Sequence, residues 1–120
     1  MKKPLIFLFV LFIACSDEPE EPINISGTWK GSTQYFYFQL AIKDYNGTLS
    51  GSAFCKSEIV NVIFTIEGKR YDKDVTLNLI SQDFLPITYS AKLINEQTLK
   101  GNITGSGFNN EELILTKYNL

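Results

Sequence analysis

The chain contains no histidine among its 120 residues. This absence excludes Ser–His and Cys–His catalysis and removes the commonest general base and the commonest metal ligand. No nucleophile motif is present in its place, and the carboxylates show no spacing that defines a catalytic pair or a metal site. We therefore expect a protein that is not an enzyme and that has neither a catalytic residue, a cofactor nor a metal.

Cysteine is almost as scarce, since the chain has only Cys15 and Cys55. Cys15 follows a short apolar segment near the N-terminus and has a separate interpretation, so Cys55 is left without a partner for an intramolecular disulfide. A lone cysteine of this kind is typically a small buried apolar residue rather than a reactive thiol.

Long hydrophobic runs are also missing. The one unbroken run, Leu5 to Ile13, is much shorter than the roughly 20 residues that span a bilayer. Two lysines precede this run, and the small residue Ala14 and then Cys15 follow it. Positive charge, a short apolar core and a small residue, in this order, are typical of a secretory signal. The pattern predicts a signal peptide over residues 1–14.

The Ala14-Cys15 ending resembles that of bacterial lipoprotein signals. The resemblance implies that the Cys15 thiol is acylated and that the lipid anchors the protein to a membrane. The acidic residues 17–21 are similar to the surface-export signals of some Gram-negative lipoproteins, which implies the outer membrane and the cell surface. The alternative is an ordinary signal peptide cleaved near Ala14, which would leave Cys15 as a free thiol.

Basic residues are few once the signal is removed. The signal holds two of the eleven lysines and arginines, so the mature chain has nine basic and thirteen acidic side chains. This balance gives no electrostatic footprint for nucleic acid, which we exclude as a partner, and it makes the lipid the expected membrane contact. Residues 15–23 are acidic and contain prolines, which predicts a solvated tether, and residues 24–120 form the folded domain.

No segment after Asn24 has a helical period. Instead, short runs rich in Thr, Ile, Val, Tyr and Phe alternate between apolar and polar residues and are separated by turn residues. Eight strands are predicted: residues 25–32, 35–43, 48–55, 59–67, 73–80, 86–94, 98–104 and 111–118. An open sheet of these strands would expose two edges, so we predict an all-β fold, an eight-stranded antiparallel up-and-down barrel.

Three short motifs carry a family resemblance. Gly27-Thr28-Trp29 resembles the Gly-x-Trp signature of lipocalin-like barrels and the opening of avidin-like barrels. Leu49-Ser50-Gly51 and Leu99-Lys100-Gly101 are similar to the Leu-x-Gly pattern of small bacterial lipocalin-like lipoproteins. The resemblance implies a lipocalin-like barrel in which Gly27 and Trp29 plug the end nearer the tether.

Alternate loops of an up-and-down barrel lie at the same end, so Phe84, Leu85 and Phe108 are predicted to share the end away from the tether. Large apolar residues in loops suggest a rim that binds a small apolar ligand or an inserted side chain. The small residues Gly51, Ala53 and Gly101 would leave room beneath it. The alternative is that the three rim side chains fold inward and cap a filled core.

Tyr35 and Tyr37 are predicted to face outward and to form a patch for a protein partner, or else to pack against neighbouring strands. Two functions follow. The first is a lipid-anchored, non-catalytic binding module for a small apolar ligand at the barrel mouth. The second is a protein-interaction lipoprotein with a filled barrel, such as an envelope-complex subunit or a hydrolase inhibitor.

Overall fold

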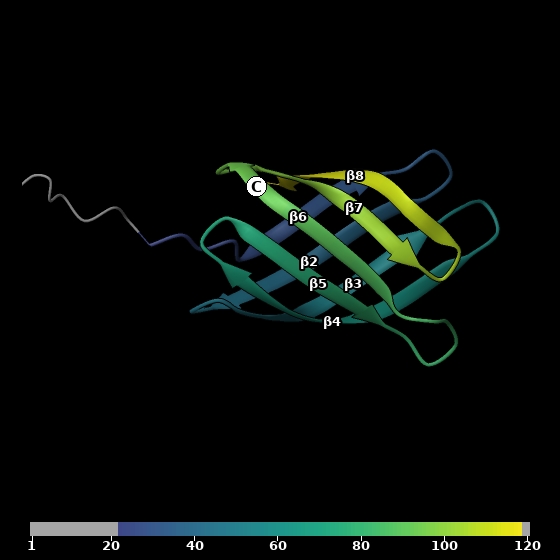
Figure 1. Cartoon of the computed structure of the whole chain (residues 1–120). Coiled ribbons are helices and arrows are strands. Elements are labelled where there is room, and N and C mark those ends of the chain that lie inside the picture. Colours follow the sequence, from purple (N-terminus) through teal and green to yellow (C-terminus); the bar gives the residue numbers. More distant parts are fainter. Residues whose placement is uncertain (1–21, 119–120) are drawn as a thin grey trace, which may run out of the picture.

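The structure, a computed structural model, describes residues 22–118. These residues form eight strands that follow one another around a closed barrel (Figure 1). The strands are β1 (Gly27–Ser32), β2 (Tyr37–Tyr45), β3 (Thr48–Lys56), β4 (Asn61–Tyr71), β5 (Asp74–Ile80), β6 (Ile87–Asn95), β7 (Thr98–Gly105) and β8 (Phe108–Tyr118). The predicted signal peptide, Cys15 and most of the predicted tether lie outside the described residues.

Every strand pairs antiparallel with its neighbour in sequence, and β1 and β8 close the barrel. The closure is short: Thr28 lies opposite Tyr118, and Lys30 lies opposite Thr116. The up-and-down topology leaves no strand edge unpaired along most of the barrel, which is the physical reason for closing an eight-stranded sheet. The predicted fold class is confirmed. Within residues 22–118 there is no helix long and apolar enough to cross a membrane.

Two turns are tighter than the sequence predicted. β4 continues to Tyr71, although residues 68–72 were predicted as a turn, because the reversal needs only Asp72 and Lys73 and Asp72 adopts a φ of 55°. β8 begins at Phe108, although residues 105–110 were predicted as a loop. Ser106 and Gly107 alone turn the chain there, with φ angles of 51° and 96°. Between the predicted strands 35–43 and 48–55, Asn46 and Gly47 form the tight turn, and both of their φ angles are positive.

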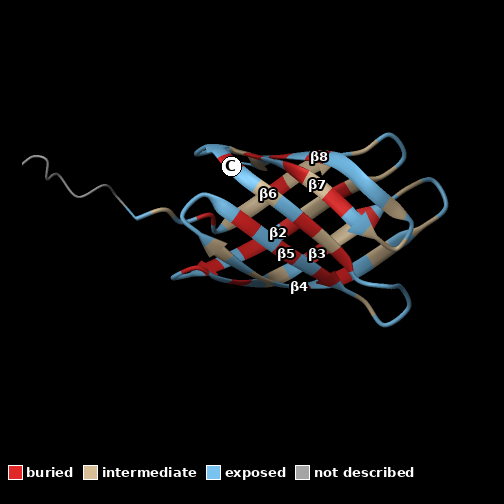
Figure 2. Ribbon diagram, viewed as in Figure 1, coloured by how far each residue is buried: buried red, intermediate tan, exposed pale blue. Residues whose placement is uncertain are grey.

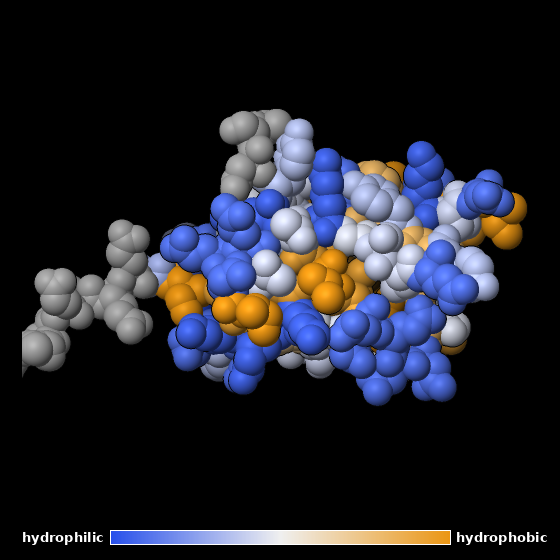
Figure 3. Space-filling view, turned by 90° about the horizontal axis from the view of Figure 1, so that it is seen from above, coloured by the Kyte–Doolittle hydropathy of each residue, from blue (hydrophilic) through white to orange (hydrophobic). Residues whose placement is uncertain are grey.

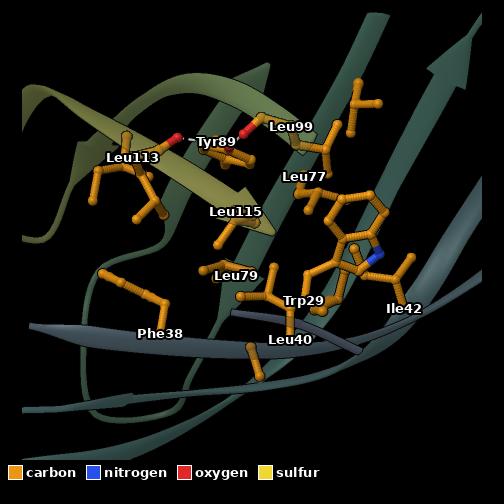
Figure 4. Packing of buried hydrophobic residues seen from close by; sticks show 14 of the residues in the cluster. Trp29, Phe38, Leu40, Ile42, Leu77, Leu79, Tyr89, Leu99, Leu113 and Leu115 are labelled. Atoms are coloured by element: carbon orange, nitrogen blue, oxygen red, sulfur yellow. Dashed lines mark hydrogen bonds between the residues drawn. The ribbon is translucent and has the colours of Figure 1, made fainter. Parts of the chain in front are cut away.

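The interior of the barrel is filled by alternate residues of all eight strands (Figure 2). Trp29, Phe38 and Tyr89 are the largest of these side chains and are at most 1% exposed. Tyr89 crosses the core, and its hydroxyl donates to the carbonyl oxygens of Leu99 and Leu113 at 3.3 and 2.8 Å (Figure 4). Burial raises the pKa of the Tyr89 hydroxyl above its usual value, so it remains a donor.

We call the end at which Pro22 enters the domain the proximal end; it carries the β2–β3, β4–β5 and β6–β7 turns (Figure 1). Trp29 lies in this half and is fully buried. Its indole Nε1 donates to the carbonyl oxygen of Ile25 at 2.9 Å, which fastens the entering chain over the core. Gly27 has a φ of +145°, and a Cβ there would lie 2.7 Å from Cε of Lys117. Trp29 thus fills the proximal part of the interior, and Gly27 lies at the start of β1 beside the Lys117 side chain.

Asp44 is the one buried charged residue among those described, and it organises the proximal end. Its carboxylate accepts hydrogen bonds from the N–H groups of Ile25 and Gly47, at 3.0 and 2.9 Å, and from Nε of Arg70 at 2.7 Å. Burial alone would raise the pKa of the Asp44 carboxyl, but the hydrogen bonds and the charge of Arg70 outweigh it and lower the pKa. We call Asp44 and Arg70 the proximal clamp.

Candidate functional site

The opposite, distal end carries the β1–β2, β3–β4, β5–β6 and β7–β8 connections. Three of these connections expose large side chains of apolar character: Tyr35 is 73% exposed, Ile59 92% and Leu85 72%. Phe84, beside Leu85, is 42% exposed. Figure 3, which views the domain from above, shows hydrophobic groups at both ends of the barrel. We call Tyr35, Ile59, Phe84 and Leu85 the distal rim.

The three predicted rim residues differ in how far their side chains are exposed. Phe84 and Leu85 are exposed, whereas Phe108 is half-buried and points into the barrel mouth. The ring centroid of Phe108 lies 5.3 Å from that of Phe36 in an edge-to-face arrangement and 5.8 Å from that of Phe38. Phe108 therefore caps the core and forms part of the wall of the mouth, while Ile59 and Tyr35 complete the rim.

Beneath the rim lies a small pocket of about 120 Å³. Apart from Ser106, its lining is apolar and consists of Phe36, Cys55, Val60, Val62, Phe64, Phe84, Ile87 and Phe108. An apolar cavity of about 150 Å³ is known to accept benzene, so this pocket suits one small ring or one branched alkyl group. It is much too small for a ligand of lipid size.

The glycines do not deepen this pocket, which corrects the expectation that Gly51 and Gly101 leave room under the rim. A Cβ at Gly51 would meet the carbonyl oxygen of Ala41, and one at Gly101 would meet that of Ser90. Both glycines thus allow neighbouring backbones to approach closely, and the space they free is already occupied. Ala53 is 4% exposed and belongs to the packed core.

Cys55 lines the pocket and has no disulfide partner among the described residues. Burial raises the pKa of its thiol to about 11, so the thiol stays protonated near neutral pH. A protonated, buried thiol is a poor nucleophile. It contributes apolar surface to the wall, as the sequence suggested.

The outward faces of four adjacent strands extend the apolar surface from the rim along the barrel wall. Tyr37 packs against Phe54 with ring centroids 6.1 Å apart, and Phe54 lies opposite Ile63 in the β3–β4 register. Ile63 is 76% exposed, and Ile80 on β5 is 38% exposed. We call Tyr37, Phe54, Ile63 and Ile80 the wall patch.

The two tyrosines of the predicted partner patch therefore have different surroundings. Tyr37 belongs to a cross-strand aromatic pair, and its hydroxyl donates to Oε1 of Gln39 at 3.2 Å. Tyr35 stands free in the β1–β2 connection, beside a shallow hollow that Phe36 and Ile59 also line. Sequence reasoning missed Phe54 and Ile63. Each of the two lies between inward-facing residues of an alternating strand, so the alternation itself indicates that its side chain faces outward.

The carboxylates offer no alternative site. No group of three or more Cys, Asp or Glu side chains that could hold a metal ion occurs between residues 22 and 118. Asp74 pairs with Lys92 at 3.7 Å, and Glu112 pairs with Lys100 at 3.9 Å, both on the exposed surface. The distal end of the described domain thus combines exposed apolar side chains with an apolar pocket. Comparison of the chain with protein-family models, with curated proteins and with solved structures gives no match.

Proposed function

We propose that the protein is a membrane-anchored, non-catalytic binding module whose distal end engages an apolar group of a protein partner. The observation that carries this proposal is the small apolar pocket of about 120 Å³ surrounded by exposed side chains from three separate connections. Exposed apolar patches of this kind mark interaction sites, since a monomer gains nothing from leaving them in water.

The shape of the surface favours a protein partner. An apolar anchor residue in a pocket, surrounded by contacts that exclude water, is the usual arrangement of an interface hot spot. The wall patch of Tyr37, Phe54, Ile63 and Ile80 adds area that a small ligand in the pocket would not reach. A protein partner could insert one leucine- or phenylalanine-sized side chain into the pocket and cover the wall patch with the surface around that side chain.

The sequence supports a location at a membrane. The lipoprotein-like signal ending at Ala14-Cys15 would place a lipid at the N-terminus, and Pro22 enters the barrel at the proximal end. The distal rim would then point away from the membrane. The Gly-x-Trp and Leu-x-Gly motifs, together with the eight-stranded barrel, support kinship with small lipocalin-like lipoproteins of the outer membrane.

A small apolar ligand is the second candidate, and the pocket itself favours it. The packed core limits such a ligand to one ring or one short branched chain. Native mass spectrometry of the protein extracted from the producing cell would show such a ligand as added mass. Val62→Phe, which fills the pocket from its wall, should remove that mass.

Affinity capture with the full anchored protein tests the proposal. Ile59→Ser and Leu85→Ser should abolish capture of a specific partner, because each removes an exposed apolar side chain of the rim. Ile94→Ser and Ile114→Ser are the matched controls, since these residues are 54% and 42% exposed and lie outside the rim. A partner that is captured equally well by the two rim variants would contradict the proposed site.

A further inference from the structure

β4 has a free edge at the distal end of the barrel. On the β3 side, pairing begins at Asn61, which is the first residue of the strand. On the β5 side it begins only at Thr65, which lies opposite Ile80 at the end of β5. Residues 61–64 therefore have a neighbouring strand on one side only, and we call the other side the β4 edge.

The register shows which main-chain groups the β4 edge leaves unpaired. In an antiparallel strand, alternate residues direct both their N–H and their C=O to the same neighbour. The N–H of Arg70 donates to the carbonyl oxygen of Gly47 on the β3 side, and the register of β4 has no shift, so its odd-numbered residues face β5. Asn61 and Ile63 thus direct their main-chain groups past the end of β5, where no described residue bonds to them.

The small apolar pocket lies directly behind the β4 edge. Val62 and Phe64 of β4, with Val60 just before the strand, form one part of its lining, and Phe84 and Ile87 form another. Side chains alternate along a strand. A chain lying along the edge would therefore direct alternate side chains inward to the pocket and outward to the wall patch.

The β4 edge lacks the features that usually prevent a free edge from pairing with another chain, such as a lysine, a proline or a bulge. Its outward-facing residues are Ile59, Asn61 and Ile63, none of which is charged. Ile59 and Ile63 are 92% and 76% exposed. The edge thus presents unpaired main-chain groups between uncharged side chains.

We propose that the partner of the distal site binds as an extended segment that adds a strand to the β4 edge, an inference that rests on the proposed function. In this mode of recognition, main-chain hydrogen bonds give affinity and pockets for alternate side chains give specificity. One leucine- or phenylalanine-sized side chain of the segment enters the pocket. Its neighbours in the segment are apolar and lie beside Ile63 and Ile80 on the outer surface.

The surroundings of the edge favour a single segment over a second copy of the barrel. The β5–β6 connection, residues 81–86, projects from the distal end in Figure 1, and its Phe84 shares the pocket with Val62. Two copies would bring their β4 edges together only if both of these connections moved aside. A single extended chain needs the width of one strand, about 4.8 Å.

Selection of a displayed library of random linear peptides on the full anchored protein tests the proposal. We expect enriched peptides to share a short apolar run without proline. Ile63→Pro should weaken their binding about tenfold more than Ile63→Ala, because only proline removes the N–H that faces the added strand. The N–H of Ile63 does not face β3, so the proline leaves the ladder between β3 and β4 intact.

The enriched peptide gives a second measurement that does not depend on the folding of the proline variant. Only alternate N–H groups of an added strand face β4. N-methylation of one alternate set of peptide amides should therefore abolish binding, whereas N-methylation of the other set should not. Val62→Phe, which fills the pocket, should also abolish binding of the unmodified peptide.

Three results would overturn the added strand: a library that yields no enriched peptide, two methylated sets that bind equally, or a partner that proves to be a second copy of this chain. The proposed function is tested separately by capture. A partner other than this chain that is lost in Ile59→Ser and Leu85→Ser, while no peptide binds, would keep the distal site and assign it to a folded surface. Capture that both rim variants leave unchanged would remove the distal site and this inference together.

Discussion

At the proximal end, the side chains that close the barrel are buried and hydrogen-bonded, whereas at the distal end the side chains around the mouth are apolar and largely exposed. Trp29, Ile25 and the clamp of Asp44 and Arg70 tie the entering chain to three strands. The distal connections are closed mainly by local turn bonds, such as that from the N–H of Ser57 to the carbonyl oxygen of Val60. The proximal end therefore carries the long-range hydrogen bonds, and the distal end leaves apolar side chains exposed.

The largest expected effect is at the proximal plug. Trp29→Ala should lower the free energy of unfolding by about 4 kcal/mol, because it removes the largest fully buried side chain and leaves a cavity. Urea unfolding followed by circular dichroism measures this. A loss below about 1 kcal/mol would show that the plug does not support the barrel.

The proximal clamp comes next. Asp44→Ala should cost about 3 kcal/mol, since it leaves the guanidinium of Arg70, whose side chain is only 11% exposed, and two N–H groups without their acceptor. The double variant with Arg70→Met should recover part of this loss, because no unpaired charge then remains at this largely enclosed position. If the double variant is less stable than Asp44→Ala, the pair does not act as a unit.

The clamp also predicts a dependence on pH. The pKa of the Asp44 carboxyl is lower in the folded protein than its ordinary value of 3.8. Its contribution is therefore present above about pH 5 and is lost as the pH falls through the lowered pKa. Wild type should lose stability below pH 4 more steeply than Asp44→Asn in urea titrations. Parallel pH profiles would contradict the assignment of this carboxylate.

A smaller loss of stability is expected at Gly101, and it shows whether the space beside this glycine is filled or empty. Gly101→Ala should cost about 2 kcal/mol, because the new methyl group would meet the backbone of Ser90 and Ala91. The double variant Gly101→Ala with Ala91→Gly provides the comparison, because the second substitution removes a methyl group that faces the same position. A neutral Gly101→Ala would restore the idea that this glycine leaves room for a ligand.

The smallest effect is expected at the distal rim. Leu85→Ser should change the free energy of unfolding by no more than about 0.5 kcal/mol, since Leu85 is 72% exposed. The same substitution should nevertheless abolish capture of the partner. A large loss of stability would mean that Leu85 supports the fold and is not free to bind.

The features that depend on alternation of apolar and polar residues within one strand could be predicted from the sequence. Strands such as β2 and β5 alternate cleanly, so their inward faces and the eight-stranded barrel could be recognised. The end of β4 was missed because Arg70 points inward, where the pattern calls for an apolar residue. Its partner Asp44 is 26 residues away in sequence, and no local signal connects the two.

The binding end was only partly predictable for the same reason. Phe84 and Leu85 can be recognised as apolar residues in a loop. Whether Phe108 turns inward, however, depends on its packing against Phe36 in the β1–β2 connection and Phe38 in β2. The size of the pocket depends on how closely strands approach at Gly51 and Gly101. These are properties of the closed barrel, and no single segment of the sequence determines them.

Photo-crosslinking from one residue at each end tests the division between the two ends most directly. A photoreactive amino acid replaces Leu85 at the distal rim or Ile94 near the proximal end, two exposed aliphatic residues, in the full anchored protein on cells. We expect a specific protein adduct from position 85 and none from position 94. An adduct from position 94 alone, or equal adducts from both positions, would contradict this expectation.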